Sequence, residues 1–153
     1  MDNDKVISTL NDLIETCRDG QEGFKEASDN AKNPELKSFF LEASRERARC
    51  VGKLQQEVRT LGGDPENGGS TAGALHRVWI DIKGTLTGKD DTSILNEAER
   101  GEDSAVEAFQ DALKEGLPAN IRSTVQQLFS EIKLTHDRVK QMRDTKSASA
   151  GRK

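Results

Sequence analysis

The sequence is short of aromatic residues. Its 153 residues include no tyrosine, one tryptophan and five phenylalanines, so aromatics make up 4% of the chain and apolar residues of all kinds only 33%. Such a composition can still bury a core in long amphipathic helices, because each helix needs only a narrow apolar stripe. A chain of this length is expected to form a single domain.

Other features are also missing. The two cysteines, Cys17 and Cys50, are too few for a disulfide framework and do not form a CxxC motif. The N-terminal MDNDKVISTL lacks the charged start and apolar centre of a signal peptide, and no apolar run approaches the roughly 20 residues that span a bilayer. With a net charge of −4 and no basic arm that carries aromatics, the chain is not expected to be a dedicated nucleic-acid binder. We therefore expect a cytoplasmic protein with neither membrane nor nucleic acid as a partner.

The apolar residues that are present recur at helical spacing. Asn33-Pro34 is typical of a helix start, while Gly62-Gly63 and Gly116 with Pro118 are typical of helix ends and turns. The pattern predicts four long helices, over about 4–31, 34–61, 93–115 and 119–144. A shorter helix is predicted over about 71–86, and no stretch indicates a strand.

The loop lengths indicate how these helices are connected. Tight turns join the first helix to the second and the third to the fourth, which predicts two antiparallel hairpins. The short helix between the hairpins is about 25 Å long, enough to travel the length of a bundle. Such a crossover favours an all-α, ferritin-like four-helix bundle over 1–143, followed by a disordered tail over 144–153.

Charged residues lie inside two of the apolar stripes. Arg47 lies between Ala43 and Cys50 at helical spacing, and Glu102 has the same central position in the third long helix. A buried unpaired charge costs several kcal/mol, roughly 3–5 when a partner is removed. We therefore predict that Arg47 and Glu102 pair across the middle of the bundle. The alternative is that their side chains lie at a seam and reach out to water.

The two histidines and the tryptophan give weaker signals. His136 flanks the stripe of the last helix, where we interpret it as a packing or hydrogen-bonding residue. Its neighbours three and four residues away include no carboxylate: they are Ile132, Lys133, Val139 and Lys140. His76 likewise has no companion at ligand spacing. Trp79 is interpreted as an apolar anchor that holds the crossover onto the bundle.

The two cysteines lie at similar depth in the first hairpin. Cys17 and Cys50 are both predicted to face inward, with Gln21 beside Cys17. They are either small buried apolar residues or a redox pair, the latter only if their Cα atoms approach within about 7 Å. A cytoplasmic setting argues against a stable disulfide.

Several stretches together resemble a known family. They are NDLIETCRDGQEGF, NPELKSFFLEASRERA, LGGDPENGGSTAGALHRVWIDIKG, ILNEAERGEDSAVEAF and THDRV. In this order they are similar to domain-of-unknown-function family 2383, a bacterial ferritin-like four-helix-bundle family found mostly in proteobacteria. The resemblance covers about 4–143 and implies the fold, because the family has no established biochemical activity.

The resemblance also implies which residues occupy the positions of a di-metal site. Di-metal ferritin-like bundles place a Glu on one helix of each pair and Glu-x-x-His on the other. The corresponding positions here are Cys17, Arg47, Cys50, Glu102, Lys133 and His136. Only Glu102 and His136 keep a ligand type, so no complete di-metal site and no di-iron oxidase chemistry are expected. A guanidinium at position 47 can instead neutralise the remaining carboxylate bidentately.

Three functions remain open. The favoured one is a non-enzymatic bundle that acts through its surface or as a homo-oligomer, in stress physiology, with no cofactor and with Arg47, Glu102, Cys17, Cys50, Gln21 and His136 as a buried polar centre. The second is an iron- or manganese-binding protein that uses Glu102 and His136 with the surface carboxylates Glu99, Asp103 and Glu107. The third is a redox sensor based on the cysteine pair.

Overall fold

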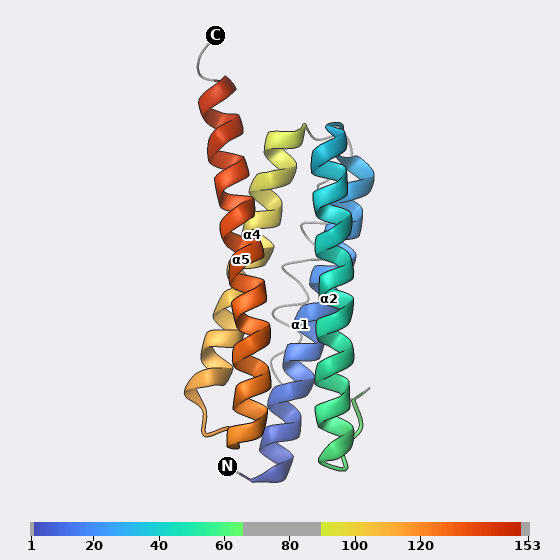
Figure 1. The fold of residues 1–153 in the computed structure, drawn as a ribbon, viewed down its shortest axis with the longest axis vertical. Helices are drawn as coiled ribbons and strands as arrows, with labels where there is room; N and C mark the ends of the chain where they lie inside the picture. The colour runs from blue at the N-terminus through green and yellow to red at the C-terminus, as the bar shows by residue number, and fades with distance from the viewer. Residues whose placement is uncertain (1, 66–89, 151–153) are drawn as a thin grey trace.

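The computed structural model describes residues 2–65 and 90–150, except for the side chains of 146–150. Its helices are α1 (Asn3–Asn30), α2 (Pro34–Thr60), α4 (Asp91–Lys114) and α5 (Ala119–Ala150), and no strand occurs within these ranges. They lie side by side as a bundle (Figure 1). The prediction of an all-α four-helix bundle is confirmed. The predicted short helix, with His76 and Trp79, lies outside the described residues.

Local capping explains where the helices begin. Asp2 accepts a hydrogen bond from the Lys5 backbone N–H at the start of α1, and Asp90 accepts one from the Ser93 N–H at the start of α4, both at 2.8 Å. Asn33 accepts from the Glu35 N–H at 2.8 Å and precedes Pro34, as the sequence predicts. Each cap satisfies a backbone donor that the first helical turn leaves free.

The end of α5 differs from the prediction. We expected a disordered tail from residue 144, but α5 continues to Ala150. The segment from Thr145 to Ala150 contains no proline or glycine and includes two alanines, which favour helix over other conformations. The lack of an apolar stripe after residue 144 therefore does not mark the end of α5.

The direction of the helices agrees with two hairpins joined by a crossover. α1 and α2 are antiparallel, as are α4 and α5, whereas α2 and α4 run in the same direction (Figure 1). α1 also packs against α4, and α2 against α5. A direct turn cannot join two parallel helices, so this arrangement requires a long connection between the hairpins.

Apolar residues form two clusters, one toward each end of the bundle. The first includes Leu10, Leu54 and Phe109, and the second includes Phe24 and Phe40. Between them along the helices lies a polar layer that contains Arg47 from α2 and Glu102 from α4. The candidate site is therefore at the middle of the bundle, with apolar packing on both sides of it.

Candidate functional site

The predicted pair between Arg47 and Glu102 is present. Arg47 Nη2 donates to Glu102 Oε1 at 2.6 Å and to Oε2 at 2.5 Å, and the side chains are only 2% and 0% exposed. Neither side chain reaches water, so the alternative of a seam position is wrong. One nitrogen serves both oxygens, whereas the predicted bidentate contact would use two nitrogens of the guanidinium fork.

The remaining space around the guanidinium is shaped by α1. The Arg47 guanidinium carbon lies 5.4 Å from the centre of the Phe24 ring, within the range of a cation–π interaction. At Gly20 an added Cβ would lie 2.7 Å from Arg47 Nη1, so only glycine leaves room there. Within the described part of the chain Nη1 has no hydrogen-bond partner. Arg47 is thus held by Glu102, by the ring and by close packing.

Arg47 remains charged in this environment. Burial has the largest single effect and lowers the pKa of Arg47, but the negative charge of Glu102, the influence of Cys17 and the hydrogen bonds to Glu102 together outweigh it, so the pKa of Arg47 is raised. A permanent positive charge therefore occupies the middle of the bundle. It repels any cation brought close to it.

Gly20 and Gly52 provide a matched test of the close contact on α1. We expect Gly20→Ala to lower the free energy of unfolding by about 1–3 kcal/mol, because its methyl group overlaps the pinned guanidinium. Gly52 lies exposed on α2, where an added Cβ would meet no atom within 4 Å. Gly52→Ala should therefore raise the free energy by about 0.5–1 kcal/mol through helix propensity. Urea unfolding measures both, and stabilisation by both substitutions would contradict the close contact.

The two cysteines face inward as predicted. Cys17 and Cys50 are 0% and 1% exposed and are both free thiols. The interaction of each thiol with the other raises the pKa of Cys17 and lowers that of Cys50. The charge of Arg47 also lowers the pKa of Cys50, whereas burial raises it. The predicted neighbour Gln21 is only half-buried, and its backbone carbonyl accepts a hydrogen bond from Ser44 Oγ at 2.8 Å.

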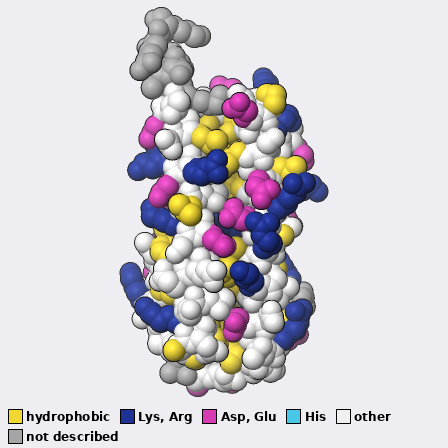
Figure 2. Space-filling model, viewed as in Figure 1, with side chains coloured by type: hydrophobic (Ala, Val, Ile, Leu, Met, Phe, Trp, Pro, Cys, Tyr) yellow, Lys and Arg dark blue, Asp and Glu magenta, His cyan; other side chains and the backbone are white. Residues whose placement is uncertain are grey.

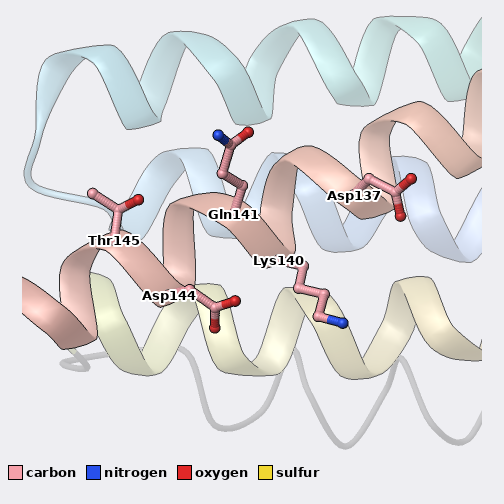
Figure 3. Close-up of a pocket in the computed structure, with 5 residues that line it drawn as sticks. All are labelled: Asp137, Lys140, Gln141, Asp144 and Thr145. Atoms are coloured by element: carbon pink, nitrogen blue, oxygen red, sulfur yellow. The ribbon is translucent and has the colours of Figure 1, made fainter.

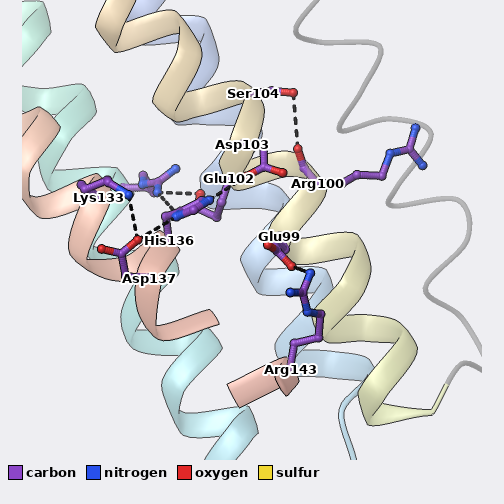
Figure 4. Close-up of polar contacts among 10 residues, drawn as sticks. Glu99, Arg100, Glu102, Asp103, Ser104, Lys133, His136, Asp137 and Arg143 are labelled. Atoms are coloured by element: carbon purple, nitrogen blue, oxygen red, sulfur yellow. Dashed lines mark hydrogen bonds and ion pairs between the residues drawn. The ribbon is translucent and has the colours of Figure 1, made fainter. Parts of the chain in front are cut away.

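His136 is a hydrogen-bonding residue, as the sequence indicates. Its Nε2 lies 2.6 Å from Asp103 Oδ1, and its Nδ1 lies 3.0 Å from Asp137 Oδ1 (Figure 4). Lys133 Nζ donates to the same Asp137 oxygen at 2.9 Å. The hydrogen bond with His136, together with the one from Lys133, lowers the pKa of Asp137. Lys133 thus points to an acidic residue on its own helix.

A second group of possible metal ligands lies beside the centre, and we call it the outer cluster. Glu99, Asp103 and His136 each offer one atom, and these atoms lie within 4.8 Å of one another. Glu99 was predicted to be a surface carboxylate, which is wrong: it is 8% exposed because Arg143 lies against it and pairs with it. Among the described residues neither Glu102 nor Glu107 belongs to this cluster, whereas His136, the predicted companion of Glu102, does belong to it.

Sequence reasoning missed two partners on α5. Arg143 pairs with Glu99, and Cys50 Sγ donates to Glu131 Oε2 at 3.9 Å. The sequence does indicate that Arg143 faces the bundle, because it lies four residues after Val139 of the apolar stripe. The spacing of residues in α5 does not indicate the contact of Glu131 with Cys50, because this contact depends on how α5 is rotated against α2.

The central residues do not fit a di-metal site. Among the six positions implied by the ferritin-like pattern, the described structure has one carboxylate, and Arg47 already binds both of its oxygens. The other positions hold a guanidinium, an ammonium, two thiols and one imidazole. Metal ions of this class need several carboxylates to balance their charge. The side chains at these positions therefore do not supply the carboxylate ligands that a di-metal centre requires.

Charged side chains of both signs lie on the face that Figure 2 shows. Lys and Arg are mixed there with Asp and Glu, without a large patch of one sign. A shallow depression is lined by Asp137, Lys140, Gln141, Asp144 and Thr145. All five come from α5 and do not converge on one point (Figure 3). In the described ranges, no helix is sufficiently long and apolar to cross a membrane.

Comparison with known proteins agrees with this architecture. The family model described as "Domain of unknown function (DUF2383)" matches residues 5–115. Among solved structures, a dodecameric thioferritin, the bacterioferritin-related protein from Bacteroides fragilis, is similar with a TM-score of 0.80 at 15% identity. The match covers 99% of this chain and 90% of that one, and at this identity it shows the fold alone. The search of curated proteins found no match. The chain belongs to the DUF2383 family and has a ferritin-like fold.

Proposed function

We propose that this protein is a non-enzymatic ferritin-like bundle that functions without a di-metal centre. The observation that carries the proposal is the buried contact between Arg47 Nη2 and both oxygens of Glu102, at 2.6 and 2.5 Å. The guanidinium supplies the positive charge that metal ions supply in di-metal bundles. The interior then needs no ion for electrical balance.

Assembly into a homo-oligomer is the second part of the proposal. The structurally similar thioferritin is dodecameric. Leu134 on α5 is 66% exposed and Leu41 on α2 is 40% exposed, so each helix presents a large apolar side chain that a second copy could cover. We assign this role to the bacterial cytoplasm and to stress physiology, on the sequence features and on the resemblance to related bundles.

Native mass spectrometry tests both parts in one spectrum. Protein purified without a tag is incubated with Fe²⁺ without oxygen, or with Mn²⁺, and then desalted. We expect an assembly whose mass is a whole multiple of 16.8 kDa with less than one metal ion per chain. Retention of one or more ions per chain at the centre would overturn the metal-free centre, and the variants described below distinguish the centre from the outer cluster. A monomer at micromolar concentration would overturn the assembly.

The outer cluster supports a second candidate function, the binding of iron or manganese. One imidazole and two carboxylates are a ligand set that such cations accept. A cation there would have to displace Arg143 from Glu99 and separate Asp103 from His136. This competition favours the first proposal.

Two variants identify the site if metal is retained. His136→Ala removes the imidazole of the outer cluster, and Glu102→Gln removes the central carboxylate charge. Loss of metal with His136→Ala alone assigns binding to the outer cluster. Loss with Glu102→Gln alone assigns it to the centre and contradicts the charge-balance argument.

A further inference from the structure

The two thiols are the reactive groups that the proposed function does not use. Cys17 on α1 and Cys50 on α2 are buried free thiols of the same apolar cluster, and each influences the pKa of the other. Gly20 lies one helical turn from Cys17 and Arg47 one turn from Cys50, and there the two helices are in close contact. A disulfide needs Cα atoms within about 7 Å, so two helices can be bridged only where they approach closely.

The surroundings favour a thiolate at one of the two sulfurs. The charge of Arg47 acts on both cysteines, Glu131 and Glu46 oppose it at Cys50, and Glu102 opposes it at Cys17. A nearby guanidinium is a feature of reactive cysteines, because the thiolate is the nucleophile. The pKa of Cys50 is lowered, mainly by its interaction with Cys17, and that of Cys17 is raised. Cys50 is therefore the better nucleophile.

The two sulfurs also differ in their access to solvent. Cys50 Sγ contacts Glu131 Oε2 at 3.9 Å, and Glu131 is half-buried on α5. Cys50 thus contacts a partly exposed residue of α5. Cys17 has no exposed area. A molecule as small as hydrogen peroxide meets Cys50 first.

We propose that Cys17 and Cys50 are a peroxide-oxidisable dithiol in which Cys50 reacts first and Cys17 closes an intramolecular disulfide. This goes beyond the proposed function and requires no metal. A transient disulfide of this kind is compatible with a reducing cytoplasm, where such bonds serve redox sensing.

The reaction balances with one hydroperoxide. The Cys50 proton passes to Glu131, which already accepts a hydrogen bond from this thiol. The thiolate attacks one peroxide oxygen, the O–O bond breaks, and the leaving hydroxide takes up the proton as water. Cys17 then attacks the sulfur of the Cys50 sulfenic acid, the S–S bond forms, and a second water leaves with the Cys17 proton. Two thiols lose two electrons, and one hydrogen peroxide becomes two water molecules.

Intact mass spectrometry of metal-free protein treated with hydrogen peroxide tests the proposal. The expected product is a single chain lighter by about 2 Da, with no thiol titratable after denaturation, and both changes should reverse with dithiothreitol. An unchanged mass with both thiols titratable would overturn the dithiol. A disulfide between chains, or oxygen added to either cysteine without a disulfide, would overturn it as well. The wild-type measurement needs no variant to fold.

Single variants test the order of reaction. In Cys17→Ala, Cys50 should form a sulfenic acid that dimedone traps, because no resolving thiol remains. In Cys50→Ala, Cys17 should stay reduced at the same dose. Trapping at Cys17 with an unreactive Cys50 would overturn the assigned roles. Glu131→Gln should slow disulfide formation several-fold, whereas Glu107→Gln, an exposed change on α4, should not. Native mass spectrometry for metal and assembly is a separate readout, so either proposal can fail alone.

Discussion

Replacing Glu102 with alanine is expected to lower the free energy of unfolding by about 3–5 kcal/mol, because the substitution leaves the buried Arg47 guanidinium without its counter-charge. Arg47 Nη2 donates both hydrogen bonds of the pair with Glu102, and Arg47 Nη1 has no hydrogen-bond partner in the described structure. Urea unfolding followed by circular dichroism measures the effect. Glu107→Ala, an exposed change on the same helix, should stay within about 0.5 kcal/mol of wild type.

A double variant separates the net contribution of the pair from the cost of breaking it. Arg47→Met combined with Glu102→Leu removes both charges and keeps apolar volume in the layer. We expect the double variant to be more stable than Glu102→Ala, by about 2 kcal/mol or more, since no buried charge remains. A double variant as unstable as Glu102→Ala would show that packing, and not the unpaired charge, causes the loss.

The second large effect is expected at Phe24. This ring is 0% exposed, lies 6.0 Å from the Phe40 ring and has the Arg47 guanidinium carbon 5.4 Å from its centre. Phe24→Ala should cost about 3–5 kcal/mol, because it leaves a cavity next to the charged layer. Phe39 is only half-buried, so Phe39→Ala should cost clearly less. Equal losses from the two substitutions would contradict the central role of Phe24.

The cation–π contribution can be measured at the same position. Phe24→Leu keeps apolar volume but removes the ring face, which is worth about 0.5–2 kcal/mol to a neighbouring cation. This part of the loss should disappear when Arg47 is already methionine. An identical effect of Phe24→Leu in both backgrounds, by urea unfolding, would show that the guanidinium gains nothing from the ring.

Local signals predicted the helices well and the end of α5 poorly. Asn33-Pro34 supplies both a side-chain acceptor and a residue suited to the first helical turn, so the start of α2 is found at the right residue. The tail after Asp144 lacks an apolar stripe, and a stripe indicates packing, not helix formation as such. α5 extends to Ala150 without one.

Residues of the candidate site were predictable only where the periodicity of a single helix determines which way a side chain points. The central place of Arg47 and Glu102 in their stripes follows from helical periodicity. Their pairing then follows from the cost of burying either one alone. The contact of Cys50 with Glu131 depends instead on the rotation of α5 against α2, which periodicity within α5 does not contain.

The amino-acid sequence by itself determined the four long helices, the two hairpins and the inward direction of Cys17, Cys50, Arg47 and Glu102, because apolar spacing and capping act within a few residues. Only the tertiary structure decided which polar groups meet: Arg143 covers Glu99, and one nitrogen of Arg47 holds both oxygens of Glu102. The physical reason is distance. Hydrogen bonds and ion pairs form within about 3–4 Å, and that precision between helices comes only from packing the whole bundle.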